Sequence, residues 1–153
     1  MSSHLAVVEV TAPAKLTLGL RVIGARGDGY HLIDAEMVSL DLVDDLSLQR
    51  THGDPCVEVH DAATGLPVDV GPPERNLVHR ALLAIGRADA CVARVTKRIP
   101  AGAGLGGGSS DAASCLLALN RLWGLRLPLA QLERLGLALG ADVPFFLRGR
   151  NAW

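Results

Sequence analysis

The sequence lacks several features that would assign it to a common class. No apolar run approaches the roughly 18 residues that a membrane-spanning helix needs. The chain does not open with basic residues followed by an apolar core, as a secretory signal does. The net charge is only −1, with acids and bases interspersed, which predicts no nucleic-acid or membrane partner. We therefore expect a soluble, cytoplasmic protein that binds any anionic ligand locally.

Cysteines and aromatic residues are also few. The three cysteines, Cys56, Cys91 and Cys115, are far apart and form no CxxC pair, which fits a reducing compartment and predicts neither a zinc site nor a redox pair. Cys115 falls within an apolar helical pattern, where a buried thiol is expected. Aromatic residues make up 3% of the chain, so the adjacent Tyr30 and His31, in the turn-rich loop over 24–31, stand out. They could stack on and hydrogen-bond to a planar ligand, or pack against a neighbouring element.

A metal site is not predicted. The segment from residue 52 to residue 61 holds two histidines and two aspartates, His52, Asp54, His60 and Asp61. Their spacing matches neither HExxH nor a finger motif. We therefore assign no metal ligand in the chain.

The hydrophobic pattern predicts one domain, which suits a chain of 153 residues with 49% hydrophobic content. Alternating apolar residues predict strands over 7–10 and 16–22 joined by a bend at Pro13, one or two antiparallel strands over 33–48, a short strand near 57–59 and a half-exposed strand over 91–99. Asp41, Asp44 and Asp45 are expected on a solvated face of the segment 33–48. Helical spacing predicts helices from 74 to about 86, from the glycine-rich stretch to Gly124, and over 128–139.

The main candidate for a functional site is the stretch 100–113, PAGAGLGGGSSDAA, which has five glycines in its first nine residues. Glycine lets the backbone turn unusually and lets a ligand approach closely. Exposed backbone N–H groups followed by a helix N-terminus form a receptor for phosphate. Ser109 or Ser110 is a natural N-cap for that helix, with Asp111 in its first turn. We therefore predict a phosphate or nucleotide site, against the alternative of a glycine-rich turn without a ligand.

The stretch fits neither of the two common nucleotide loops. Gly102, Gly104 and Gly107 match the dinucleotide fingerprint, but a Rossmann turn follows a strand buried on both faces, whereas the segment before this loop alternates and ends at a proline. A Walker loop is excluded because no Gly-Lys-Ser/Thr closes the stretch. A dinucleotide-binding oxidoreductase is therefore the least favoured function.

Two charged residues in apolar surroundings are the best candidates for chemistry. Lys15 lies among apolar strand residues, where an ammonium needs a partner unless its stem follows the sheet and its head reaches solvent. Asp142 follows a predicted helix and precedes the apolar run 143–147, so its carboxylate is expected to be partly desolvated and to need a cation or hydrogen bonds, such as those of a local Asx-turn. Lys15 and Lys97 are the only lysines in the chain. Lys15 is therefore the predicted partner of Asp142.

With these pieces assembled, the chain resembles the N-terminal part of a GHMP-superfamily kinase. The resemblance rests on APAKLTLGL at 12–20, GDGYHLI at 27–33, NLVHRA at 76–81, PAGAGLGGGSSDAA at 100–113, LNRLW at 119–123 and LGADVPFFLRG at 139–149. It implies an α+β fold of the ribosomal-protein-S5 domain-2 type, a mixed or antiparallel sheet with helices packed on it and a glycine-rich phosphate loop before a helix. It also implies an ATP-binding N-terminal domain over 1–153, a C-terminal domain that this chain lacks, and an exposed apolar face where that domain docks.

The resemblance also implies an activity. The tyrosine-histidine and GADVPFF pieces point to kinases that use ATP and Mg²⁺ to phosphorylate a hydroxyl of a small molecule, a cytidine-diphosphate-linked methylerythritol, in the non-mevalonate route to isoprenoid precursors. The alternative is a truncated, noncatalytic nucleotide-binding fragment of such a kinase.

The resemblance implies roles for single residues as well. Asp142 is the base on the substrate hydroxyl, with Lys15 beside it. Substrate contacts are implied for Thr17, Tyr30, His31 and Lys97. ATP-phosphate contacts are implied for Pro100, Gly102, Gly104, Leu105, Gly106, Gly107, Gly108, Ser109 and Ser110. Thr17 departs from the family, which usually has asparagine there; the hydroxyl is kept and the paired donor and acceptor of an amide are lost.

Overall fold

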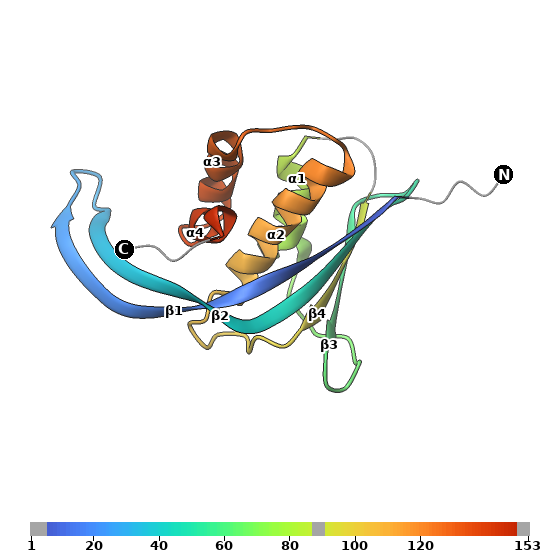
Figure 1. Ribbon diagram of the computed structural model, residues 1–153, viewed down its shortest axis with the longest axis horizontal. Coiled ribbons are helices and arrows are strands. Elements are labelled where there is room, and N and C mark those ends of the chain that lie inside the picture. Colours follow the sequence, from blue (N-terminus) through green and yellow to red (C-terminus); the bar gives the residue numbers. More distant parts are fainter. Residues whose placement is uncertain (1–5, 87–90, 150–153) are drawn as a thin grey trace.

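The fold is a four-stranded mixed sheet with its helices packed on one face, seen in a computed structural model that describes residues 6–86 and 91–149 (Figure 1). The strand order is β1-β2-β4-β3, where β1 spans Val7–Ala25, β2 His31–Arg50, β3 Cys56–Asp61 and β4 Cys91–Lys97. β1 with β2 and β2 with β4 are antiparallel, and β3 with β4 is parallel. This arrangement confirms the α+β class with a mixed sheet.

The first two strands form one long hairpin, so the prediction of two short strands joined at Pro13 was wrong. β1 continues through Pro13 because it is an edge strand, where a missing N–H costs no ladder bond, and a register shift between Pro13 and Lys15 absorbs the irregularity. Two further shifts follow, between Thr17 and Gly19 and between Val22 and Gly24. Figure 1 shows the result, a hairpin arm that curves toward the side of the helices.

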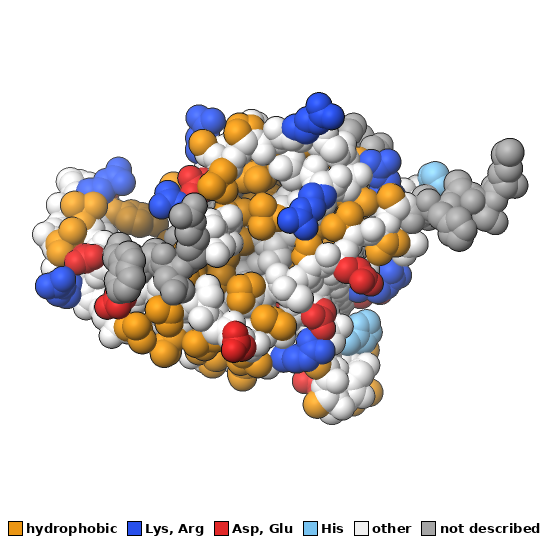
Figure 2. All heavy atoms as spheres, in the orientation of Figure 1, with side chains coloured by type: hydrophobic (Ala, Val, Ile, Leu, Met, Phe, Trp, Pro, Cys, Tyr) orange, Lys and Arg blue, Asp and Glu red, His pale blue; other side chains and the backbone are white. Residues whose placement is uncertain are grey.

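The outer half of this hairpin stands free of the other strands, because β4 pairs only with residues 45–50 of β2. We call residues 15–39 the arm. Its large apolar side chains with more than two fifths of their area exposed are Leu16, Leu18, Leu20, Val22, Ile23, Leu32 and Ile33. Figure 2 shows hydrophobic side chains gathered along the arm.

The segment between the parallel strands carries a short 3₁₀ turn, η1 (Pro73–Arg75), and helix α1 (Leu77–Ala84). The predicted helix start at residue 74 was therefore too early. Asn76 is the N-cap, and its side-chain oxygen accepts hydrogen bonds from the N–H groups of Val78 and His79 at 2.9 and 3.1 Å. The two prolines before it fit the 3₁₀ turn, and the asparagine begins the α-helix.

Three helices complete the layer: α2 (Gly107–Leu122), α3 (Leu129–Leu139) and α4 (Val143–Arg148). Cys115, for which burial was predicted, is fully buried on α2, as are Leu116 and Leu119 of the same helix. The apolar run 143–147 is the short helix α4, whose two phenylalanines pack edge to face. Within the described parts of the chain, no helix is both long and apolar enough to cross a membrane.

Candidate functional site

The glycine-rich stretch leaves β4 as a loop that turns into α2. Gly102, Gly104 and Gly106 have φ values of 71°, 74° and 71°, a left-handed conformation that strongly favours glycine. At Gly106 space matters too, because an added Cβ would lie 2.9 Å from Cζ of Phe146 and 3.0 Å from Cγ of Lys15. At Gly102 and Gly104 a Cβ would meet nothing within 4 Å, so the backbone there is open to an approaching ligand.

The start of α2 differs from the prediction. The N-cap is Gly106, and no side chain caps the helix, whereas Ser109 or Ser110 was expected there. The two serines are the third and fourth residues of the helix, and Asp111 lies beyond the first turn. Since the first N–H groups of a helix have no partner within it and no side chain covers them here, they remain available to a ligand.

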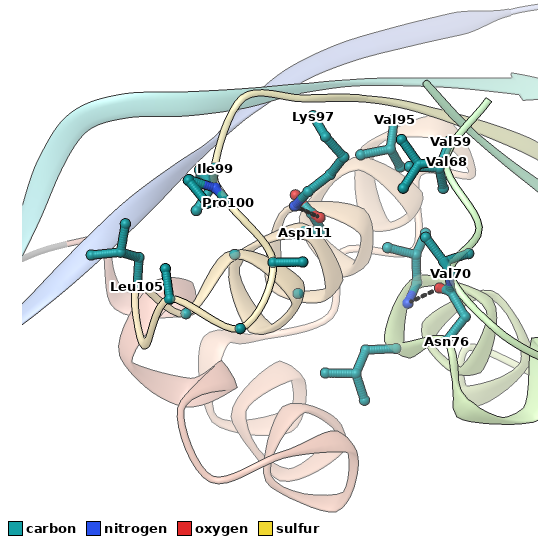
Figure 3. Close-up of a pocket in the computed structure, with 18 of the residues that line it drawn as sticks. Val59, Val68, Val70, Asn76, Val95, Lys97, Ile99, Pro100, Leu105 and Asp111 are labelled. Carbon is teal, nitrogen blue, oxygen red and sulfur yellow. Dashed lines mark hydrogen bonds and ion pairs between the residues drawn. The ribbon is translucent and has the colours of Figure 1, made fainter. Parts of the chain in front are cut away.

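A cavity of about 640 Å³ lies against the loop (Figure 3). Glycine-loop backbone from residue 100 to residue 108 forms one side of it. Apolar side chains from β3, the following loop, α1 and β4 form much of the rest: Val59, Val68, Val70, Val78, Val95 and Ile99. The cavity thus combines an apolar part with a stretch of polar backbone, within the size range of small-molecule sites. Of the loop residues predicted to bind phosphate, Ser109 and Ser110 do not line it.

The structure brings Lys15 and Asp142 together, although they lie near opposite ends of the chain. Nζ of Lys15 is 3.6 Å from Oδ2 of Asp142 and donates a hydrogen bond of 2.9 Å to Oγ1 of Thr17. The Lys15 side chain is 12% exposed and that of Asp142 is 41% exposed. An ammonium this buried beside a carboxylate that still meets solvent is a geometry in which Asp142 can accept a proton from a bound hydroxyl.

Asp142 precedes α4 without capping it by a side-chain hydrogen bond, so the carboxylate is not used in local structure. Lys15 is tied to the glycine loop by its backbone, since its N–H donates to the carbonyl of Leu105 at 2.9 Å. The pair therefore lies next to the glycine loop. Thr17 contacts the ammonium, which places the residue that departs from the family inside the same group.

Lys97, in contrast, is held in a cluster of buried charges. Its Nζ donates to Oδ2 of Asp44 in a very short contact and to Oδ2 of Asp111 at 2.8 Å. Asp44 is fully buried and Asp111 is 4% exposed. The expectation of Asp44 on a solvated face was therefore wrong, because its side chain lies on the inner side of β2 together with Leu46 and Leu48.

Asp44 also fixes the entry to the glycine loop. Its Oδ1 accepts the backbone N–H groups of Arg98 at 2.5 Å and Ile99 at 2.8 Å. Asp111 is less well satisfied, since its Oδ1 is buried and has no hydrogen-bond partner. Figure 3 shows Lys97 and Asp111 pointing toward each other beside the loop.

These contacts determine the charge states. Burial raises the pKa of Asp111 to about 7, even though the Lys97 ammonium favours its ionised form. Burial opposes the charge of Lys97, but the two carboxylates outweigh this effect and hold the pKa of Lys97 above its ordinary value. The floor of the cavity thus carries a firmly protonated lysine and a carboxyl group that titrates near neutrality.

Tyr30 and His31 lie at the tip of the arm, away from the cavity. Gly29, with a φ of 82°, makes the turn before them, and Tyr30 is 69% exposed. The alternative that they pack against a neighbouring element is therefore disfavoured for Tyr30. Because the arm curves back, its tip lies on the same side of the sheet as α4 (Figure 1).

Sequence reasoning missed the Asp44–Lys97–Asp111 cluster and the valines of the cavity. The alternation along the strand could have indicated that Asp44 is buried, since position 44 lies on the same face as Leu42, Leu46 and Leu48. Helical spacing was the signal for Asp111, four residues before the buried Cys115. Val68 and Val70 come from a segment that reads as loop, and the other cavity valines lie on predicted strands and a predicted helix that carry no ligand motif.

The fold and the loop define a class of protein. The chain carries a GHMP kinase N-terminal domain, because residues 76–150 match the family described as GHMP kinases N terminal domain. Two curated relatives are each named 4-diphosphocytidyl-2-C-methyl-D-erythritol kinase. That of Variovorax paradoxus is 49% identical over 97% of this chain and 49% of its own length, and that of Chromobacterium violaceum is 48% identical over 92% and 49%. The chain thus spans about half the length of these relatives.

Solved structures agree. A crystal structure of 4-(cytidine 5'-diphospho)-2C-methyl-D-erythritol kinase superposes with a TM-score of 0.72 at 42% identity, over 95% of this chain and 50% of that one. Homoserine kinase from Cytophaga hutchinsonii superposes with a TM-score of 0.63 at 21% identity, over 99% of this chain and 45% of that one, which shows the shared fold alone. The fold is therefore that of the GHMP kinases, the ribosomal-protein-S5 domain-2 type.

Proposed function

We propose that the chain is the ATP-binding part of a kinase that phosphorylates a hydroxyl of 4-diphosphocytidyl-2-C-methyl-D-erythritol. The observation that carries the proposal is the Lys15–Asp142 pair, joined to the glycine loop through the backbone bond from Lys15 to Leu105. Phosphoryl transfer needs positioning and charge neutralisation more than covalent help, and these parts supply both. The names of the relatives support the choice of substrate.

The cavity fits ATP. Its apolar part, with Val59 and Val95, suits a purine base, and the loop backbone and uncapped helix N-terminus suit phosphates. When bound, ATP supplies the phosphoryl group. Among the described residues no group of three His, Cys, Asp or Glu side chains could hold a metal ion, and Asp44 and Asp111 are both engaged by Lys97. We therefore assign no step to Mg²⁺.

The chain's own groups would act as follows. Asp142 accepts the proton of the substrate hydroxyl as the oxygen forms its bond to phosphorus. Lys15, whose ammonium lies 3.6 Å from the Asp142 carboxylate, helps to orient the hydroxyl. Thr17 holds the Lys15 ammonium in place. Tyr30 and His31, at the tip of the curved arm, would bind the cytosine by stacking and hydrogen bonding.

A coupled assay of ADP release in the presence of the cytidyl substrate tests this function. Wild type should release ADP in a substrate-dependent way, and Asp142→Ala should abolish release. If both proteins release ADP alike, Asp142 is not the base. Arg148→Ala, which removes the ion pair between Arg148 at the end of α4 and Glu133 of α3, is a matched control and should keep the wild-type rate.

The second candidate is a nucleotide-binding fragment without catalysis. It is favoured by the exposed apolar side chains of the arm, which suit contact with another domain. Under this proposal the half of the full-length relatives that this chain does not span covers the arm. Nucleotide binding with no substrate-dependent release by wild type would support it.

A further inference from the structure

The Asp44–Lys97–Asp111 cluster beside the glycine loop has more negative than positive groups, and the proposed reaction gives this excess charge no role. Two carboxylates, on β2 and α2, share one ammonium from β4. With all three ionised the cluster carries one excess negative charge. It lies at the cavity, since both Lys97 and Asp111 line it and a Cβ on Gly107 would come within 3.1 Å of Nζ of Lys97.

The two carboxylates are not equivalent. Asp44 uses both of its oxygens, for Lys97 and for the backbone N–H groups of Arg98 and Ile99. Asp111 uses Oδ2 for Lys97, and its buried Oδ1 has no partner. A proton bound to the cluster would therefore go to Asp111, because protonating Asp44 would weaken three existing hydrogen bonds.

We propose that Asp44 and Asp111 position the Lys97 ammonium beside the phosphate loop, and that a nucleotide binding there takes up one proton from solvent, held by Asp111. The inference rests on the proposed nucleotide site. Phosphates placed beside an excess negative charge are repelled, and a proton on Asp111 leaves the cluster neutral. Because the pKa of Asp111 is already about 7, little free energy separates its two forms at physiological pH.

Among the charged and titratable groups around the cavity, Asp111 is the one expected to take up the proton when a nucleotide binds. Cys115, the titratable neighbour on the same helix, has its pKa raised by burial and stays neutral. Arg98 directs its guanidinium to Asp45 and to the carbonyl of Val43. The remaining charged residues that line the cavity are Asp61, Asp69 and Arg75. Asp61 accepts hydrogen bonds from its own loop that lower its pKa, so it stays ionised.

The test is calorimetric titration of the 153-residue chain with ADP at pH 8 to 9, in two buffers with different ionisation enthalpies. In this range the terminal phosphate of ADP is fully ionised, since such phosphates titrate near pH 6. Wild type should take up close to one proton per ADP, and its affinity should fall by up to tenfold per pH unit. Asp111→Asn, nearly identical in shape, should take up none and bind ADP more tightly than wild type at pH 9.

Adenosine is the matched control ligand, because it lacks phosphates and should bind without proton uptake. Equal uptake of protons by wild type and Asp111→Asn overturns the inference and leaves the nucleotide site standing. Absence of ADP binding by wild type overturns both. Should the variant fold poorly, the carboxyl ¹³C signal of Asp111 in wild type answers the question, because its pKa must rise on addition of ADP. An unchanged pKa refutes the inference.

Discussion

Replacing either aspartate of the Asp44–Lys97–Asp111 cluster by asparagine removes one negative charge, but we expect the two replacements to have opposite effects on the stability of the fold. Asp44→Asn leaves one acceptor oxygen where there were two. With that oxygen toward the N–H groups of Arg98 and Ile99, the two bonds from these groups are weakened, and the bond from the Lys97 ammonium is lost because an amide NH₂ cannot accept it. Since a hydrogen bond to a charged acceptor contributes about 1.5–3 kcal/mol and one to a neutral acceptor about half of that, we expect a loss of at least about 3 kcal/mol. Asp111→Asn instead removes a buried carboxylate, one oxygen of which has no hydrogen-bond partner. The pKa of Asp111, about 7 against 3.8 in the unfolded chain, means that its ionised form lowers the stability of the fold by up to about 4 kcal/mol at pH 8.

Urea unfolding at pH 8, followed by far-ultraviolet circular dichroism, measures both changes. With a slope of about 2 kcal/mol per molar urea, the midpoint of Asp44→Asn should fall by about 1.5 M, and that of Asp111→Asn should rise. Asp45→Asn is the matched control, because Asp45 is half exposed and pairs only at the surface with Arg98, so its effect should stay within about 1 kcal/mol. If Asp44→Asn raises the midpoint as Asp111→Asn does, the excess negative charge decides stability and the hydrogen-bond argument fails. If Asp111→Asn lowers the midpoint, the penalty assigned to its buried charge is wrong.

Three further predictions concern stability. The stability advantage of Asp111→Asn over wild type should be complete above pH 7 and vanish near pH 4. The pKa of Asp111 is raised from 3.8 in the unfolded chain to about 7 in the fold, so wild type is fully stable when Asp111 is protonated below pH 3.8 and loses stability as the pH rises toward 7. A constant advantage across this range would contradict the assignment. Gly106→Ala should cost about 1–3 kcal/mol in thermal unfolding, since it combines a left-handed φ with a clash against Phe146, whereas Gly53→Ala, in open space, should cost less than about 0.5 kcal/mol. Asn76→Ala should lower the urea midpoint by the equivalent of about 1 kcal/mol through loss of the α1 cap, and no change would mean that the neighbouring 3₁₀ turn starts the helix.

Much of the site could be predicted from the cost of burying charge. Lys15 and Asp142 both lie in apolar surroundings, and the scarcity of lysine left few ways to satisfy the aspartate; the structure places them 3.6 Å apart. The alternation with Leu46 and Leu48 would have predicted that Asp44 is buried, and the same rule would then have required a partner for its carboxylate. Its partners could not have been predicted, because pairing across strands depends on a register that one sequence does not specify.

Local rules failed where tertiary contacts overrode them. Serine is a better N-cap than glycine by propensity, yet the N-cap of α2 is Gly106, where only a residue without a side chain fits beside Phe146 and Lys15. Pro13 would end a central strand, but on the edge strand it does not. Neither the glycine N-cap nor the strand that continues through Pro13 could have been predicted from the neighbouring residues in the sequence.

The position of Asp44 bears on how the protein folds. Its three hydrogen-bonding partners lie 53 to 55 residues further along the chain, so this connection closes a long loop. Contacts between residues this far apart in sequence require the chain to lose the conformational entropy of a long loop before their interaction energy is gained, so we expect them to form late in folding. We therefore expect the entry to the glycine loop to form only after β2 and β4 have paired, and partly folded chains to lack it. A nucleotide that binds at this loop, as we propose, would bind the folded state alone, and by mass action it would shift the folding equilibrium toward that state, increasingly so above its dissociation constant.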